Sequence, residues 1–291
     1  MTTVAGDNCT MSGLLDQQGM DSQTENTVSV PALICESDGE ARMRQQHLIR
    51  ERPVTIFVND QELVTLLCTG HHLDELAAGF LRAEGFIESR EDVRQLVTDA
   101  EASIVRITIC QDTSFLEKLW NKRTITSGCG KGTLFYHAVD ALLAEPVNSM
   151  VRIDPLQIWE RMQDLSRLSQ TYRHTHGVHN TALADPNNIL LFRDDIGRHN
   201  AVDMIIGYSL LHGLSLADKI LITTGRLTSE ILIKAAKVGL PVLASRNTAT
   251  SLAVELATAL NITLIGYVRN GKSTVYSGHH RVACGLPAPG K

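Results

Sequence analysis

The sequence contains few aromatic residues and no long uncharged hydrophobic stretch. Aromatics make up 4% of the 291 residues, and lysine and arginine form no dense run, so the chain lacks the stacking platforms and basic surface of a typical nucleic-acid-binding protein. No segment reaches the roughly eighteen apolar residues of a membrane span. Residues 1–27 also lack the apolar core of a signal peptide. We therefore expect a cytoplasmic protein with no nucleic-acid partner and no membrane partner.

Cysteine is also sparse, and its positions are far apart in the chain. No C-x-x-C or zinc-type pair occurs, which argues against a structural metal and a disulfide framework and fits a reducing compartment. The positions are Cys9, Cys35, Cys68, Cys110, Cys129 and Cys284.

Histidines recur at short spacing in residues 174–179, but no neighbouring cysteine or carboxylate completes a tetrahedral set. We expect no metal site, although Asp185 downstream leaves a distant ligand open. His179 is expected to line a pocket or the edge of the core. The chain also lacks a Walker-type lysine loop, a G-x-G-x-x-G turn and a G-x-S-x-G elbow, so nucleotide hydrolases and serine hydrolases have no support.

The length and the 43% hydrophobic content suffice for two domains, each with its own core. Residues 1–28 are polar and without periodicity, which predicts a disordered tail. Two β-rich runs then meet across Asn59-Asp60, and a helix follows with Thr69 as its cap and Gly85 as its left-handed end. Together with a strand at 103–110, these elements predict a small α+β domain over residues 29–123.

Residues 124–285 predict a layered α/β domain. Asp154 as cap and Pro155 in the first turn open a helix that continues through Leu168. Strands and helices then alternate, and Asn270-Gly271 offers a hairpin turn. The expected ranges are 189–192, 219–223, 242–245, 262–268 and 274–276 for strands and 200–211, 227–237 and 251–260 for helices.

Cys129 is the candidate nucleophile, because it lies in the glycine-rich loop 126–132 directly before an apolar repeat at helical spacing. A helix N-terminus and the nearby Lys131 would both stabilise a thiolate and lower the pKa of the thiol. The alternative is that Cys129 is a small buried hydrophobe and that the glycines only form a turn.

Three segments place an arginine between a strand and a helix start, where α/β sheets bind ligands. They are 193–200, 224–226 and 245–247. Arginine forks and helix N-termini together bind phosphate well, so the three segments favour an anionic ligand. The simpler alternative is that Arg193 and Arg198 pair with Asp194 and Asp195 to hold the turn.

These motifs, in this order, resemble those of the FdhD family, the formate dehydrogenase accessory sulfurtransferases. The likeness runs from about Val54 to Ser277 and rests on several separate segments. They are 73–81 with Glu84-Gly85, 127–130, 193–203, 224–226 with Ser229-Glu230, Ser245-Arg246, and 251–253.

The resemblance implies a sulfur carrier and a cytidine-deaminase-like α/β domain in a homodimer. Cys129 would accept sulfur as a persulfide from a cysteine desulfurase and pass it to the molybdenum cofactor before the cofactor enters formate dehydrogenase. The cofactor would be bis(molybdopterin guanine dinucleotide), for which a guanine nucleotide can substitute. Deaminase zinc chemistry is not expected, because the H-x-E and P-C-x-x-C signatures are absent. The implied cofactor-binding residues are Tyr267, Val268, Arg269, Asn270, Gly271 and Lys272, with Arg198 and Arg226 from the arginine loops.

The chain departs from the family pattern at Gly132, where many members carry a second cysteine that could attack the persulfide and release sulfide. Sulfur would then leave Cys129 directly or through another thiol. A non-catalytic cofactor-binding chaperone therefore stays an alternative, and bound zinc would revive a third reading as a hydrolase. Smaller departures are His176 where glycine is usual, Met204 where lysine is usual and Ala249 where proline is usual.

Overall fold

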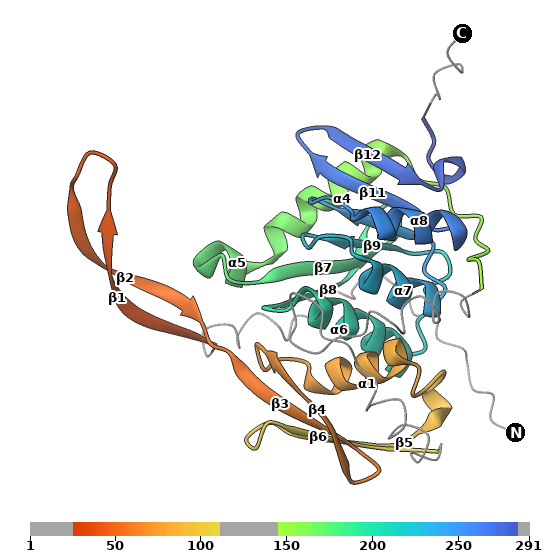
Figure 1. The fold of residues 1–291 in the computed structure, drawn as a ribbon, viewed down its shortest axis with the longest axis horizontal. Helices are drawn as coiled ribbons and strands as arrows, with labels where there is room; N and C mark the ends of the chain where they lie inside the picture. The colour runs from red at the N-terminus through yellow and green to blue at the C-terminus, as the bar shows by residue number, and fades with distance from the viewer. Residues whose placement is uncertain (1–25, 111–144, 285–291) are drawn as a thin grey trace, which may run out of the picture.

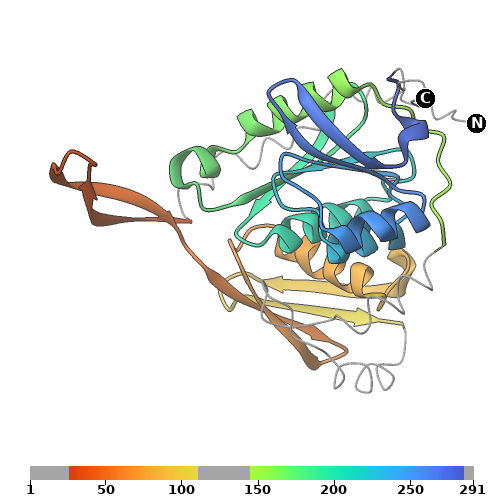
Figure 2. The same cartoon turned by 45° about the horizontal axis from the view of Figure 1, so that its top comes forward.

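The computed structural model describes residues 26–110 and 145–284, which form a mixed α/β structure, as predicted (Figure 1). Its layers are a four-stranded sheet, a helical layer, a six-stranded sheet and a final covering helix (Figure 2). A separate two-stranded hairpin extends from one end. The predicted boundary between residues 123 and 124 lies outside the described residues.

The four-stranded sheet has the order β4-β3-β6-β5, and one helix, α1, covers it. The elements are β3 (Arg52–Val58), β4 (Gln61–Cys68), α1 (Leu73–Glu84), a 3₁₀ turn (Arg90–Asp92), β5 (Val93–Asp99) and β6 (Ile104–Ile109). The predicted β3–β4 hairpin is confirmed, with positive φ at both Asn59 (47°) and Asp60 (65°). Strand β5 was not predicted, because most of its side chains are exposed and its sequence shows no clear alternation.

Helix α1 ends at Gly85 as predicted, where φ is 87°. The prediction that Thr69 caps its start is wrong, because the N-cap residue is His72. Thr69 instead donates from its backbone N and from Oγ1 to Asp195 Oδ2, at 2.7 and 3.0 Å. The Thr69 hydroxyl, which the local pattern assigned to a helix cap, is therefore used in a tertiary hydrogen bond.

The six-stranded sheet has the order β12-β11-β10-β9-β7-β8, with β9, β10 and β11 parallel. Its strands are β7 (His179–Ala184), β8 (Ile189–Asp195), β9 (Ile220–Thr223), β10 (Val242–Ser245), β11 (Thr263–Arg269) and β12 (Lys272–Ser277). Its helices are α4 (Pro155–Leu168), α5 (Gln170–Thr175), α6 (Arg198–Leu211), α7 (Ser229–Lys237) and α8 (Ser251–Ala259), followed by a 3₁₀ turn (His279–Arg281). The predicted alternation of strands and helices is confirmed, whereas α5 and β7 were not predicted as elements.

Successive residues of the central strands feed two different cores, as the pleat requires. In β9, Ile220 and Ile222 pack with residues of α4 on one face of the sheet. Leu221 points to the opposite face and packs with α6, α7 and α8. The sheet is therefore buried on both faces, and its strand ends are the places where loops can form a site.

Two glycines set the contact between α1 and α6. A Cβ atom at Gly79 would lie 1.7 Å from the carbonyl oxygen of Asp203, and one at Gly207 would lie 1.8 Å from that of Glu75. The two helix backbones touch at this crossing, because glycine alone leaves room for such an approach. Met204 of α6 also enters the core under the four-stranded sheet, so the two parts share a continuous interface.

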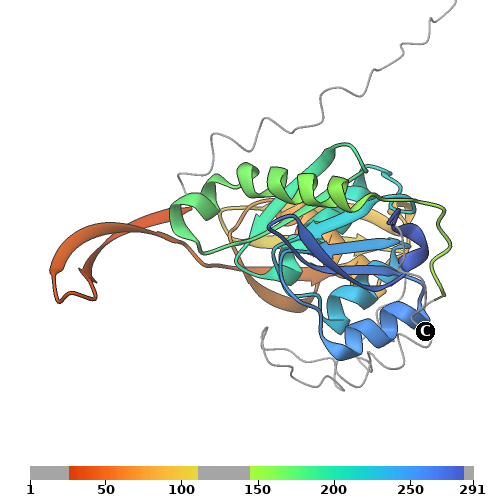
Figure 3. The same cartoon turned by 90° about the horizontal axis from the view of Figure 1, so that it is seen from above.

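The extended hairpin consists of β1 (Thr27–Cys35) and β2 (Ala41–Ile49), and we call it the arm (Figures 1 and 3). It projects away from the layered body beside α5. β1 begins at Thr27, within the last two residues of the predicted tail. The arm was not predicted from the sequence: β1 has alternating apolar residues, but β2 is mostly polar, and no side chain of either strand is buried.

Candidate functional site

The proposed nucleophile Cys129 lies outside the described residues, as do Gly128, Gly130, Lys131 and Gly132 of its loop. The structure therefore bears on the predicted ligand site and on the other thiols. Cys68 is fully buried, and burial, followed by the charge of Asp195, raises its pKa to about 12. Its thiol stays protonated at neutral pH and is a poor substitute for a second reactive cysteine. Cys35, Cys110 and Cys284 are exposed free thiols.

A cavity of about 470 Å³ opens at the carboxyl ends of β9, β10 and β11, where β7 also begins. This edge of the sheet is where the sequence placed a ligand. We call it the edge cavity. Its lining residues are Ser166, Tyr172, His176, Gly177, Val178, His179, Asn180, Ile196, Thr224, Arg246, Asn247 and Arg269.

Hydrogen bonds between neighbouring strand ends hold the floor of the edge cavity. Thr224 Oγ1 accepts from the backbone N of Asn180 at 3.0 Å, and the Asn180 carbonyl accepts from the backbone N of Thr224 at 2.9 Å. On the next strand, Ser245 Oγ donates to the carbonyl of Gly225 at 2.6 Å and accepts from the backbone N of Asn247 at 2.9 Å. The loops are thereby fixed relative to one another, which is what a preorganised binding site requires.

Asn180 is the most informative polar group in the edge cavity. Its side chain is 1% exposed, and its Oδ1 has no hydrogen-bond partner among the described residues. An unpaired buried amide costs roughly 1–3 kcal/mol, so a ligand that supplies an N–H or O–H donor would recover that energy. Sequence reasoning missed Asn180, because no local pattern distinguishes it from the other residues of a buried strand.

Cationic groups surround the edge cavity. Arg246 and Arg269 line it and are exposed. The positive charges of Arg198 and Arg226 lie close enough to His179 to lower its pKa. Burial, followed by the charges of Arg198 and Arg226, lowers the pKa of His179, so its imidazole is neutral at pH 7. Arg198 Nε is also buried without a hydrogen-bond partner in residues 26–110 and 145–284. These four arginines favour an anionic ligand. His179 lines the edge cavity, as the sequence predicted.

Arg246 was noted in the sequence as part of a loop but was not included among the cofactor-binding residues. Its signal resembles that of Arg226, because each arginine follows a short buried strand, Arg246 directly and Arg226 after two intervening residues. The structure places Arg246 on the cavity wall and Arg226 beside it. The difference depends on which way each loop turns, which the strand pattern does not encode.

The predicted segment 267–272 lies between two cavities. Tyr267 is 39% exposed with φ 53°, and the guanidinium of Arg269 lies 5.1 Å from its ring centroid. Val268 is 1% exposed and belongs to the core, so its side chain is directed away from solvent. Asn270 and Gly271 form the predicted turn, with φ 53° and 68°.

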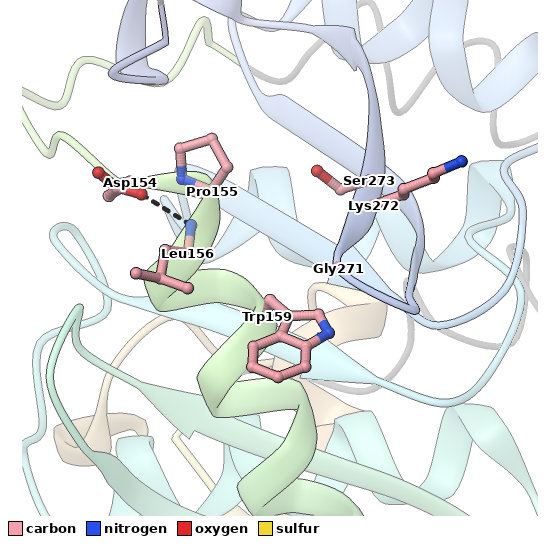
Figure 4. Close-up of a pocket in the computed structure, with 7 residues that line it drawn as sticks. All are labelled: Asp154, Pro155, Leu156, Trp159, Gly271, Lys272 and Ser273. Carbon is pink, nitrogen blue, oxygen red and sulfur yellow. Dashed lines mark hydrogen bonds between the residues drawn. The ribbon is translucent and has the colours of Figure 1, made fainter.

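Gly271 and Lys272 line a second cavity of about 410 Å³, between the tip of the β11–β12 hairpin and the first turn of α4 (Figure 4). Asp154 caps this helix by accepting from the backbone N of Leu156 at 2.7 Å, and Pro155 follows it, as predicted. Trp159 contributes an aromatic wall. The structure thus assigns Arg269 and Lys272, only three residues apart, to different cavities.

The segment 193–195 does not take part in the edge cavity. Arg193 is 4% exposed and binds Glu75 with two hydrogen bonds of 2.6 Å, which joins β8 to α1. Although burial raises the pKa of Glu75, the bonds from Arg193 and His72 outweigh it and hold the pKa below its usual value. The alternative that Arg193 pairs with the adjacent aspartates is therefore wrong, because its partner lies on another element.

The two aspartates of this segment also have structural partners. Asp194 accepts from Ser169 Oγ at 2.8 Å, and Asp195 accepts from Asn200 Nδ2 at 2.7 Å in addition to Thr69. Burial raises the pKa of both carboxyls. Within the described residues, no cluster of three His, Cys, Asp or Glu side chains is placed to hold a metal ion.

Comparison with known proteins identifies the family. The family model described as FdhD/NarQ matches residues 49–283, which is most of the chain. The chain belongs to the FdhD/NarQ family. This finding confirms the resemblance on which the role of Cys129 and the cofactor-binding residues were predicted.

FdhD/NarQ relatives are similar over most of their length. A "Sulfur carrier protein FdhD" of Bacillus subtilis is 40% identical over 244 residues, covering 84% of this chain and 93% of the relative. A protein of the same name from Staphylococcus aureus is 38% identical over 245 residues, covering 84% and 92%. The crystal structure of a putative formate dehydrogenase accessory protein from Desulfotalea psychrophila has a TM-score of 0.72 and 25% identity, covering 88% of this chain and 99% of that one.

No described helix of this FdhD/NarQ chain combines the length and apolar composition that crossing a bilayer requires.

His176 stands where the family resemblance expects glycine. It ends α5 with φ 53°, a conformation that glycine adopts most readily. The departure from the pattern therefore falls on a backbone position on the wall of the edge cavity.

Proposed function

We propose that this protein is a sulfurtransferase of molybdenum cofactor maturation. Cys129 accepts sulfur as a persulfide from a cysteine desulfurase and passes it to bis(molybdopterin guanine dinucleotide) before the cofactor enters formate dehydrogenase. Support comes from the family and from relatives named sulfur carrier proteins. The solved relative carries the name of a formate dehydrogenase accessory protein. The site of action we propose is cytoplasmic.

The edge cavity is the observation that carries this proposal. Its arginines suit the pyrophosphate groups of a guanine dinucleotide, because guanidinium forks form bidentate, charge-assisted hydrogen bonds with phosphate oxygens. Asn180 Oδ1, buried and without a partner among the described residues, suits an N–H group on a heterocycle. A small neutral substrate would leave both features unused.

In the proposed reaction, the Cys129 thiolate attacks the terminal sulfur of the desulfurase persulfide. A new S–S bond forms at Cys129 and the desulfurase thiolate leaves. Since Gly132 stands where a second thiol would resolve this persulfide, the sulfur stays on Cys129 until its acceptor arrives. The loop of residues 126–132 would then deliver it to the cofactor held in the edge cavity.

Mass spectrometry tests the persulfide step. After incubation with a cysteine desulfurase and cysteine, the peptide that contains Cys129 should gain one sulfur atom, and the gain should disappear on treatment with a reducing thiol. Cys129→Ala is the matched control. If no adduct forms while a known acceptor is loaded in parallel, the carrier role is wrong and the cofactor-binding chaperone becomes the better account, an alternative that the missing second loop cysteine favours.

Arg269→Ala should weaken the binding of GDP, used as a probe of the guanine dinucleotide, because one charge-assisted contact in the edge cavity is lost. The expected loss is on the order of 1.5–3 kcal/mol, or roughly 10- to 150-fold in affinity. Isothermal titration calorimetry measures it. Lys272→Ala is a matched control, since it removes a cation from the second cavity and should leave the affinity unchanged. The reverse result would place the nucleotide in the second cavity.

A further inference from the structure

The edge cavity has two chemically different sides. On one side, the end of α5 and the start of β7 contribute Tyr172, His176 and Asn180. On the other side, the ends of β10 and β11 contribute the cations of Arg246 and Arg269. The strand order β7-β9-β10-β11 separates the two sides by two or three strand spacings, which is about 10–14 Å. A ligand with a planar ring at one end and an anionic group at the other matches this division.

The first side carries an aromatic pair. The rings of Tyr172 and His176 meet edge-on, with centroids 5.0 Å apart and an angle of 81° between their planes. In this geometry, the ring that supplies the edge keeps both of its faces free of the other ring. The backbone N of His176 donates to the carbonyl of Tyr172 at 2.8 Å, which fixes the two residues relative to each other. Aromatic side chains that line a cavity can bind a planar heterocycle by stacking.

Asn180 lies next to this pair and gives the first side its selectivity. Its buried Oδ1, which lacks a partner in residues 26–110 and 145–284, is a carbonyl oxygen that can accept two hydrogen bonds. Guanine presents two donors side by side, its ring N1–H and its 2-amino group, whereas adenine presents an acceptor at N1 beside its amino group. A pterin ring carries the same 2-amino-4-oxopyrimidine edge as guanine. The acceptor on Asn180 therefore favours this edge over that of adenine.

We propose that Tyr172, His176 and Asn180 form a subsite that selects the 2-amino-4-oxopyrimidine edge of the ligand. The inference rests on the proposed function, since the proposed cofactor carries this edge in both its guanine and its pterin rings. The planar ring stacks on the aromatic pair, and Asn180 Oδ1 accepts from its N–H and amino groups. The phosphates extend towards Arg246 and Arg269, which bind phosphate whatever the base.

Isothermal titration calorimetry with GDP and ADP tests the role of Asn180. The two probes carry the same charge, so the arginines treat them alike, and the native chain should bind GDP roughly tenfold more tightly because of the added hydrogen bonds. Asn180→Leu, a change of similar shape, should lower the affinity for GDP to that for ADP and leave the affinity for inorganic pyrophosphate unchanged. The unfolding midpoint of this variant should stay the same or rise, because an unpaired buried carbonyl has been removed. A purely structural role would lower it.

Variants of the aromatic pair test the stacking. Tyr172→Leu should weaken GDP binding roughly 5- to 150-fold, the range for loss of one base–aromatic stack, whereas Tyr172→Phe keeps the ring and should bind as the native chain does. His176→Asn removes the second ring but tolerates the left-handed φ of 53°. It should also weaken GDP binding. None of the three changes should alter the affinity for pyrophosphate.

Neopterin, used as a second probe, shows which ring of the cofactor occupies the subsite. If it is the guanine ring, the affinity for GDP depends on Asn180 and Tyr172. If it is the pterin ring, the affinity for neopterin depends on them and that for GDP does not. The proposal is overturned if the native chain binds GDP and ADP equally and Asn180→Leu leaves neopterin binding unchanged.

The persulfide experiment is independent of this subsite, because Asn180 and the aromatic pair take no part in loading sulfur. A sulfur adduct at Cys129 without any selectivity for the ring edge would therefore overturn the subsite and leave the carrier role standing. Selectivity for the ring edge without an adduct would overturn the carrier role and leave the subsite standing.

Discussion

Gly207→Ala is expected to lower the free energy of unfolding by about 3 kcal/mol, the upper part of the range for overpacked interiors. The added methyl carbon would lie 1.8 Å from the carbonyl oxygen of Glu75 and 2.7 Å from the backbone N of Gly79. Both are backbone atoms of α1, so no side-chain rotation relieves the contact and the helices must separate. A shift of α1 would also disturb the ion pair of Glu75 with Arg193, which joins this helix to β8.

Gly207→Ala should lower the stability, although alanine usually stabilises a helix relative to glycine. Within a helix, alanine is normally about 0.5–1 kcal/mol better than glycine, so an uncrowded site would gain stability. Denaturant unfolding followed by circular dichroism gives the difference. Gly213→Ala is the matched control, since no atom lies within 4 Å of its added Cβ and only the positive φ of 65° opposes the change. A Gly207→Ala protein as stable as the native one would show that the helices do not cross so closely.

Cys129→Ala is expected to abolish the activation of formate dehydrogenase in a strain that lacks the native protein. The proposed function requires a thiolate at this position, and alanine provides no nucleophile. The loss should therefore be complete, whereas a purely structural cysteine would give a partial loss through lower stability. Formate dehydrogenase activity in cell extracts, compared at equal amounts of the accessory protein, measures the effect.

Two controls separate chemistry from folding in this experiment. Cys35→Ala removes an exposed thiol on the arm, and Cys110→Ala removes one next to the segment that contains Cys129; both variants should retain activation. The purified Cys129→Ala protein should keep its native unfolding midpoint and its affinity for GDP. Full activation by Cys129→Ala would exclude the carrier role, whatever the nucleotide result.

Local signals in the sequence predicted much of the fold. Asp154 and Pro155 were expected to start a helix, and Gly85 to end one, and both expectations are confirmed because each depends on hydrogen bonds within a few residues. The Asn59-Asp60 turn is confirmed for the same reason. Thr69 failed as a cap because Asp195, 126 positions away, competes for its hydroxyl.

The same distinction applies to the candidate site. Strand ends followed by arginines indicated the edge of the sheet at which the edge cavity lies. The glycine-rich loop and the family resemblance both pointed to Cys129, whose loop lies outside the described residues. The sequence did not separate Arg193, which is bound to Glu75, from Arg246, which faces the edge cavity. In the sequence, each of these arginines comes just after a short apolar run, so their local patterns are alike.

The sequence by itself therefore determined the α/β class, most of its strands and helices, the family, and the candidate nucleophile. Only the tertiary structure decided which side chains share a cavity, that Arg269 and Lys272 serve different cavities, and that α1 and α6 touch through Gly79 and Gly207. The physical reason is that periodicity and capping report contacts within one element. Strand order and helix crossing bring together residues more than a hundred positions apart, such as Glu75 and Arg193, and no local pattern records that pairing.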